Sequence, residues 1–144
     1  LQPRSERTPD PRPALPTKFE GREDGSRYVV TGKGGLIREV QLPSHLAARL
    51  EAQRLATPRP VTDRHVYYQQ HYAIGGGQPW SMAVSRAAKA ALGWSTGAHG
   101  LRHAYAQERV TELQTLQDSR HVANETVSQE LGHFRPEITT TYLR

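Results

Sequence analysis

The chain has 144 residues and a formal net charge of +5, with 19 lysines and arginines against 14 aspartates and glutamates. This length is enough for one compact domain with a hydrophobic core. The absence of cysteine excludes disulfides, cysteine–zinc sites and thiol catalysis. No apolar run reaches the ~18 residues of a membrane span, so no membrane association is expected. The positive charge favours polyanionic partners, although many basic proteins bind none.

Residues 1–25 are predicted to form a proline- and arginine-rich arm that precedes the main domain. Proline removes a backbone donor and disfavours helix at the preceding residue, so a linker or an ordered but irregular arm is expected. We place the domain boundary near residue 25 and expect the folded domain over residues 26–144. Five of the ten prolines fall in this arm: Pro3, Pro9, Pro11, Pro13 and Pro16.

Residues 26–43 predict a β-hairpin. Residues 28–30 (Tyr-Val-Val) favour a strand, and the glycines at 32, 34 and 35 suit a turn. Leu36, Val40 and Leu42 then lie on one face of the returning strand. Lys33 is expected at or near the tip of this hairpin.

The rest of the chain predicts a mainly helical fold. A helix is expected from Ser44 to Leu55, stopped by the prolines at 58 and 60, followed by an ambiguous stretch over 61–79 with a possible short strand at 66–68. Further helices are expected over residues 81–92, 99–116 and 122–131, with a last short helix that begins at Pro136. The predicted fold class is therefore α+β, mainly α, with a small antiparallel sheet near the N-terminus.

The candidate site lies in two compact histidine motifs and a tyrosine. His99 and Arg102 fall within His-Gly-Leu-Arg-His, and His133 ends Leu-Gly-His. Tyr142 follows His133 by nine positions (142 − 133). Together with Lys33, these residue types would allow a tyrosine to attack a phosphodiester without a metal or a cofactor.

Each residue has a chemical role in such a reaction. The phenol of Tyr142 is the nucleophile, and its ordinary pKa near 10 means that it needs a base or a positive pocket. Arg102 clamps the phosphate oxygens, and His99, one helical turn earlier, takes the phenolic proton. Lys33 donates a proton to the leaving 5′ oxygen. His133 hydrogen-bonds the phosphate or helps to position the nucleophile.

Taken singly, these residues have simpler interpretations. Lys33 in a glycine-rich turn is commonly a solvated lysine, and Tyr142 is commonly a packing aromatic residue. His103 is more typical of a structural histidine than of a catalyst. The i, i+4 spacing of His99 and His103 suits a metal, but Gly100 stands where a zincin would have its glutamate, so no metal is expected.

The combination resembles the catalytic domain of the tyrosine recombinase, or phage-integrase, family. The matching pieces are residues 31–35 (Thr-Gly-Lys-Gly-Gly) with 38–40 (Arg-Glu-Val), 98–104 (Ala-His-Gly-Leu-Arg-His-Ala), 127–133 (Val-Ser-Gln-Glu-Leu-Gly-His) and 139–142 (Thr-Thr-Thr-Tyr). The resemblance implies a mostly helical catalytic fold, binding of double-stranded DNA in a C-shaped clamp and strand exchange. It also implies self-association as a tetramer on paired DNA sites in the full-length protein, and a cytoplasmic, nucleoid-associated location.

The match is incomplete, because the family carries a second arginine before the hairpin. Arg22 lies only eleven residues before Lys33 (33 − 22), which is too close, and Arg7 lies twenty-six before it (33 − 7) among prolines. We therefore expect a shortened chain or a decayed gene, with weak DNA binding and slow or no cleavage. The alternatives are a non-catalytic DNA-binding module and a type IB topoisomerase-like activity.

Overall fold

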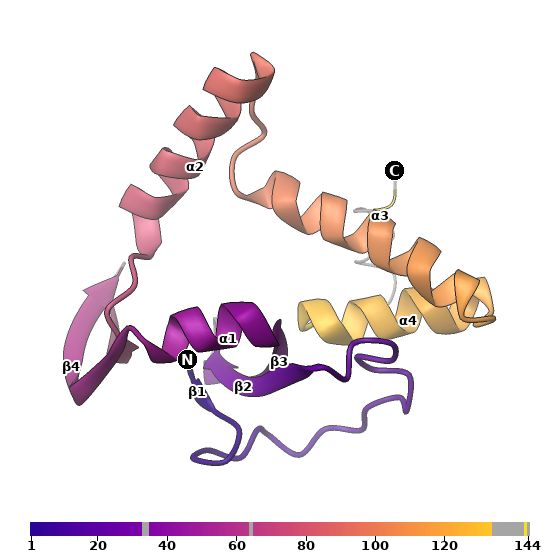
Figure 1. Ribbon diagram of the computed structural model, residues 1–144, viewed down its shortest axis with the longest axis horizontal. Coiled ribbons are helices and arrows are strands. Elements are labelled where there is room, and N and C mark those ends of the chain that lie inside the picture. The colour runs from indigo at the N-terminus through magenta and orange to yellow at the C-terminus, as the bar shows by residue number, and fades with distance from the viewer. Residues whose placement is uncertain (33–34, 64, 134–142, 144) are drawn as a thin grey trace. The chain divides into compact units, whose positions relative to one another are not determined.

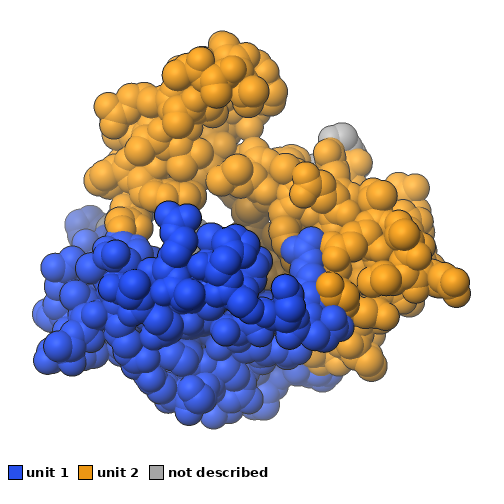
Figure 2. All heavy atoms as spheres, in the orientation of Figure 1, with its two compact units in different colours: residues 1–13, 22–74 blue, residues 14–21, 75–144 orange. Residues whose placement is uncertain are grey.

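The computed structural model describes residues 1–32, 35–63, 65–133 and 143, and it has an α+β fold in which helices predominate. Figure 1 shows the chain as a ribbon, and Figure 2 colours its two compact units separately. Unit 1 contains Leu1–Pro13 and Arg22–Ile74, and unit 2 contains Ala14–Gly21 and Gly75–Arg144. The chain thus enters unit 2 briefly, returns to unit 1, and then completes unit 2.

The predicted hairpin forms the main part of a three-stranded antiparallel sheet in unit 1. Strands β1 (Gln2–Pro3), β2 (Gly25–Thr31) and β3 (Ile37–Pro43) are adjacent in that order. At the turn, the Gly32 amide donates to the Leu36 carbonyl over 2.7 Å, and Gly35 has a φ of 82° that only glycine adopts readily. Lys33, which sequence placed at this tip, lies outside the described residues.

Helix α1 (Ser44–Glu51) packs on β2 and β3 and completes a small core in unit 1. The buried residues of this core are Tyr28, Ala47, Leu50 and Tyr72. The prediction that the helix continues to Leu55 is wrong, because strand β4 already begins at Arg54. Pairing of residues 54–63 with a neighbouring strand overrides the helix propensity of the last predicted turn.

The stretch that was ambiguous in sequence forms a two-stranded ribbon. Strand β4 (Arg54–Asp63) pairs antiparallel with β5 (Val66–Tyr72), and their register shifts between Arg54 and Arg59. The prolines at 58 and 60 therefore sit within a strand and do not terminate a helix. A ribbon of two strands leaves each strand with one open edge, where a missing proline donor costs little.

Unit 2 contains three helices: α2 (Gly77–Leu92), α3 (His99–Thr115) and α4 (Arg120–Leu131). Helix α2 begins four residues earlier than the predicted Ser81, because Pro79 falls in its first turn, where backbone N–H groups have no intrahelical partner. Gly93 and Gly132 end α2 and α4 with φ values of 79°, as their sequence positions predicted. The last predicted helix, from Pro136, lies outside the described residues.

Helices α3 and α4 lie side by side and form the core of unit 2 (Figure 1). The core residues recur every three or four positions, which places them on the facing sides of the two helices. They are Ala106, Val110 and Leu113 from α3 and Ala123, Val127 and Leu131 from α4. Leu143 packs against this core, and it is the residue that directly follows Tyr142 in the chain.

Residues Ala14–Gly21, here called the docked segment, are bound to the α3–α4 pair by polar contacts from their own backbone and side chains. The Leu15 amide donates to Gln129 Oε1 over 2.8 Å, and the hydroxyls of Thr17 and Thr126 lie 2.5 Å apart. Phe19 is 5% exposed. This part of the predicted arm is therefore an ordered component of unit 2.

Candidate functional site

Arg102 and His133 come together at one end of the α3–α4 pair. Arg102 Nη2 lies 2.8 Å from the carbonyl oxygen of Leu131 and 3.2 Å from His133 Nε2. Arg102 belongs to the first turn of α3, whereas His133 follows the end of α4. The structure thus joins the arginine of one predicted motif to the histidine of the other.

The turn at the end of α4 explains how His133 reaches Arg102. Gly132 is left-handed, which lets the His133 amide donate back to the Ser128 carbonyl over 2.8 Å. The Ser128 hydroxyl in turn donates to the His133 carbonyl over 3.2 Å. Two hydrogen bonds between the same two residues therefore fix the backbone that carries the imidazole.

The contact with Arg102 also bears on the tautomer of the imidazole. A guanidinium only donates hydrogen bonds, so His133 Nε2 must supply a lone pair to accept this one. A hydrogen bond at this contact therefore requires the tautomer that carries its proton on Nδ1. Both side chains are partly exposed.

Of the other three predicted site residues, the structure describes only His99. His99 is the first residue of α3, is exposed, and lies three positions before Arg102, so the two project to the same side of the helix. Lys33 and Tyr142 lie outside the described residues. The structure therefore brings Arg102 and His133 together and leaves the predicted positions of Lys33 and Tyr142 as predictions.

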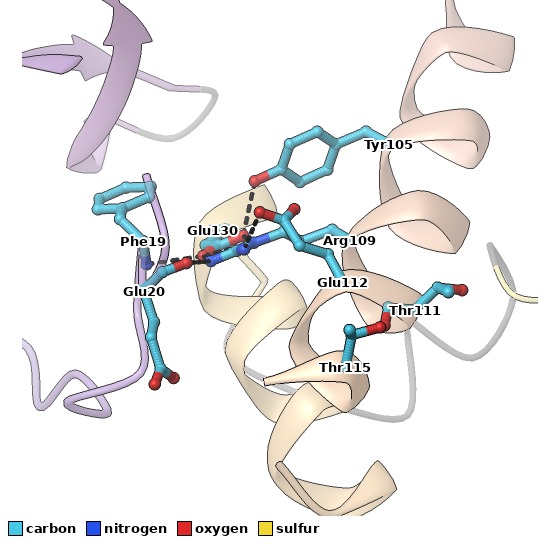
Figure 3. A network of polar contacts seen from close by, with 8 residues as sticks. All are labelled: Phe19, Glu20, Tyr105, Arg109, Thr111, Glu112, Thr115 and Glu130. Carbon is cyan, nitrogen blue, oxygen red and sulfur yellow. Dashed lines mark hydrogen bonds and ion pairs between the residues drawn. The ribbon is translucent and has the colours of Figure 1, made fainter. Parts of the chain in front are cut away.

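A buried charge network beside this pair was not predicted from sequence (Figure 3). The side chains of Arg109 and Glu130 are both 0% exposed, and Arg109 Nη2 lies 3.0 Å from Glu130 Oε1. Tyr105 donates to Glu130 Oε2 over 2.6 Å, and the Phe19 amide donates to Glu130 Oε1 over 2.8 Å. Arg109 Nη2 also donates to the Glu20 carbonyl over 2.8 Å.

The electrostatics of the network keep its arginine charged. Burial acts to lower the pKa of Arg109, but hydrogen bonds and charge from Glu130 and then Glu112 hold that pKa above its ordinary value. The sequence did contain a signal for this pair. Arg109 lies four positions from both Tyr105 and Leu113, and Glu130 lies three positions after Val127, so each charge falls in the apolar stripe of its helix.

Arg7, the one residue whose spacing suited the missing family arginine, follows β1 in unit 1. Its guanidinium donates to Gln2 Oε1 over 3.2 Å.

Among the described residues, no three histidine, aspartate or glutamate side chains are grouped as metal ligands would be. Over the same residues, no helix has both the length and the apolar character needed to cross a bilayer.

Comparison of the chain with protein-family models, with curated proteins and with solved structures found no match in any of the three.

Proposed function

We propose that this chain is the catalytic part of a tyrosine-type site-specific DNA recombinase, which breaks and rejoins DNA without a metal. The observation that carries the proposal is the contact between Arg102 and His133, 3.2 Å apart although they lie thirty-one positions apart in sequence. The motif resemblance makes the same two residues the anion-binding part of the site. The two side chains meet where both are partly exposed, and an arginine in such a place is a typical ligand of a phosphate.

In the proposed step, the Tyr142 Oη attacks the phosphorus of a DNA phosphodiester, and an O–P bond forms as the P–O5′ bond breaks. His99 takes the phenolic proton, and Lys33 gives a proton to the departing 5′ oxygen. Arg102 and His133 donate to the non-bridging oxygens, where negative charge accumulates. The products are a 3′-phosphotyrosyl link and a free 5′ hydroxyl, and reversal of the step rejoins the strand without ATP.

The charge distribution supports a DNA substrate. No aspartate or glutamate occurs between Asp63 and Glu108, whereas Arg86, Lys89 and Arg102 all lie in that stretch. Lysine and arginine neutralise backbone phosphates, so this part of the chain suits double-stranded DNA. We also propose that the full-length protein self-associates as a tetramer on paired DNA sites, in the cytoplasm and near the nucleoid.

The test uses duplex DNA in which one bridging 5′ oxygen is replaced by sulfur. A thiolate leaves without a proton and rejoins poorly, so even a slow enzyme accumulates its covalent adduct. The candidate DNA is a library of random duplexes that carry this linkage, incubated in a chelator. The expected result is a denaturation-resistant adduct that Tyr142→Phe abolishes and Arg102→Ala reduces by about 10²-fold or more.

A matched pair of substrates tests the role of Lys33. Lys33→Ala is expected to lose cleavage of the ordinary oxygen linkage but to keep cleavage of the sulfur linkage, because only the oxygen needs a proton. Salt-sensitive binding with no adduct on either substrate would instead indicate a non-catalytic DNA-binding module. Relaxation of supercoiled DNA by the chain, without paired sites, would indicate a topoisomerase-like activity. Either result contradicts the proposal.

A further inference from the structure

We infer that Glu130 and Arg109 are positioning residues that hold Arg102 and His133 together, with the docked segment as their third partner. This inference rests on the proposed function, because it concerns the same Arg102–His133 site. Arg109 lies outside the motifs that suggested catalysis, and Glu130 lies within residues 127–133 but had no role assigned to it. The carboxylate of Glu130 is buried where three parts of unit 2 meet: the docked segment, α3 and α4 (Figure 3).

Both oxygens of Glu130 accept hydrogen bonds, and the donors come from two separate parts of the chain. Oε1 accepts from the Phe19 amide at 2.8 Å and from Arg109 Nη2 at 3.0 Å. Oε2 accepts from the Tyr105 hydroxyl at 2.6 Å and from Arg109 Nε at 3.1 Å. Because donors engage both oxygens, these bonds orient the carboxylate and tie the last turn of α4 to α3.

That turn of α4 is the one that forms the site. Leu131, the residue after Glu130, supplies the carbonyl that accepts from Arg102 at 2.8 Å. On α3, Tyr105 and Arg109 follow Arg102 by three and seven positions, so all three share one face of the helix. Glu130 thus ties the end of α4 to the same helix face that carries Arg102.

Small movements of this turn matter chemically. Hydrogen bonds of 2.8 Å and 3.2 Å join Arg102 to the two acceptors beyond Glu130, and a displacement of 1 Å would break both. A misplacement of that size in an active site costs about 10²-fold in rate. A role limited to stability would instead leave the Arg102–His133 contact intact in every molecule that is folded.

The docked segment is part of the same arrangement. It receives a hydrogen bond from Arg109 at the Glu20 carbonyl and gives one to Glu130 from the Phe19 amide. The chain on both sides of it, residues 1–13 and 22–74, belongs to unit 1. The chain thus enters strand β2 of unit 1 shortly after a segment that contacts Glu130 and Arg109.

The test reads the tautomer of His133, which a purely structural role would not change. Nitrogen NMR of the histidine rings, at a pH where they are neutral, is expected to show the His133 proton on Nδ1 in the native chain. In Glu130→Gln the ring is expected to show a mixture of both tautomers, because Arg102 no longer engages Nε2. Tyr105→Phe, which removes one bond and keeps the ion pair, is expected to shift the tautomer ratio in the same direction by a smaller amount.

The matched control is Leu113→Ala, which opens the same α3–α4 core at a side chain that is 0% exposed and outside the network. It is expected to lower the melting temperature and to leave the His133 tautomer unchanged. Adduct formation with the sulfur-linked DNA is expected to fall by about 10-fold or more in Glu130→Gln and by much less in Leu113→Ala.

The outcomes separate this inference from the proposed function. An unchanged tautomer in folded Glu130→Gln and Tyr105→Phe, or an equal change in Leu113→Ala, overturns the positioning role. If Glu130→Gln does not fold, the tautomer of His133 in Tyr105→Phe, compared with that in Leu113→Ala, tests the positioning role. A tautomer change in the network variants, together with no adduct from the native chain, supports the positioning role and contradicts the recombinase chemistry.

Discussion

Removal of Arg109 is the perturbation whose effect on stability the structure defines most closely. The Arg109→Met variant keeps much of the side-chain volume but leaves the Glu130 carboxylate buried without the guanidinium that pairs with it. Arg109 Nη2 also bonds the Glu20 carbonyl, and Nη1 pairs with Glu112 at 3.1 Å. Breaking one side of a buried ion pair costs about 3–5 kcal/mol, so we expect the free energy of unfolding to fall by that amount.

A double-mutant cycle separates the charge effect from lost packing. Once Arg109 is methionine, Glu130→Leu removes the uncompensated charge, so the double variant is expected to be more stable than the sum of the single effects predicts. We expect a coupling energy of about 2 kcal/mol or more, measured by urea unfolding followed by circular dichroism of the helices. Single effects that add within about 0.5 kcal/mol would show that the two side chains do not act as a pair, and would refute the reasoning.

Two further predictions concern pH and a helix cap. Burial, followed by the hydrogen bond and charge of Glu51, raises the pKa of Tyr28 from 10.0 to about 12. The stabilisation this gives is therefore fully present below pH 10 and lost between about pH 10 and 12 in alkaline unfolding, by at most about 3 kcal/mol. Tyr28→Phe should reduce that dependence without removing it, because burial and Glu51 also raise the pKa of Tyr72. The Ser119 hydroxyl accepts from the Val122 amide at the start of α4, so Ser119→Ala is expected to cost about 1 kcal/mol in urea unfolding, whereas an unchanged midpoint would contradict the capping role.

The local sequence signals accounted for much of the fold. Alternating apolar residues and glycines predicted the β2–β3 hairpin, and the glycines at 93 and 132 marked the ends of two helices. The errors arose where a partner distant in sequence decides the structure. Residues 54–63 are a strand only because β5 pairs with them, and no periodicity within those residues indicates it.

The sequence likewise predicted the local part of the candidate site better than the part that depends on distant contacts. His99 and Arg102 could be related from sequence, because their spacing on one helix is local. The meeting of Arg102 with His133 depends on how α3 packs against α4, and sequence only suggested it through the motif resemblance. Glu130 was overlooked because its importance lies in contacts with Phe19 and Arg109, which are 111 and 21 positions away. No short sequence pattern indicates that a carboxylate is buried and paired in this way.

The central claim is that Tyr142 forms a covalent bond to the 3′ phosphate of a broken DNA strand. The most direct measurement is mass spectrometry of the adduct formed on the sulfur-linked duplex, after nuclease trimming and proteolysis. We predict a nucleotide attached through its 3′ phosphate to the peptide that contains Tyr142, with the other product ending in a 5′ thiol. Attachment to any other residue, attachment through a 5′ phosphate, or strand breakage with no protein-linked nucleotide would contradict it.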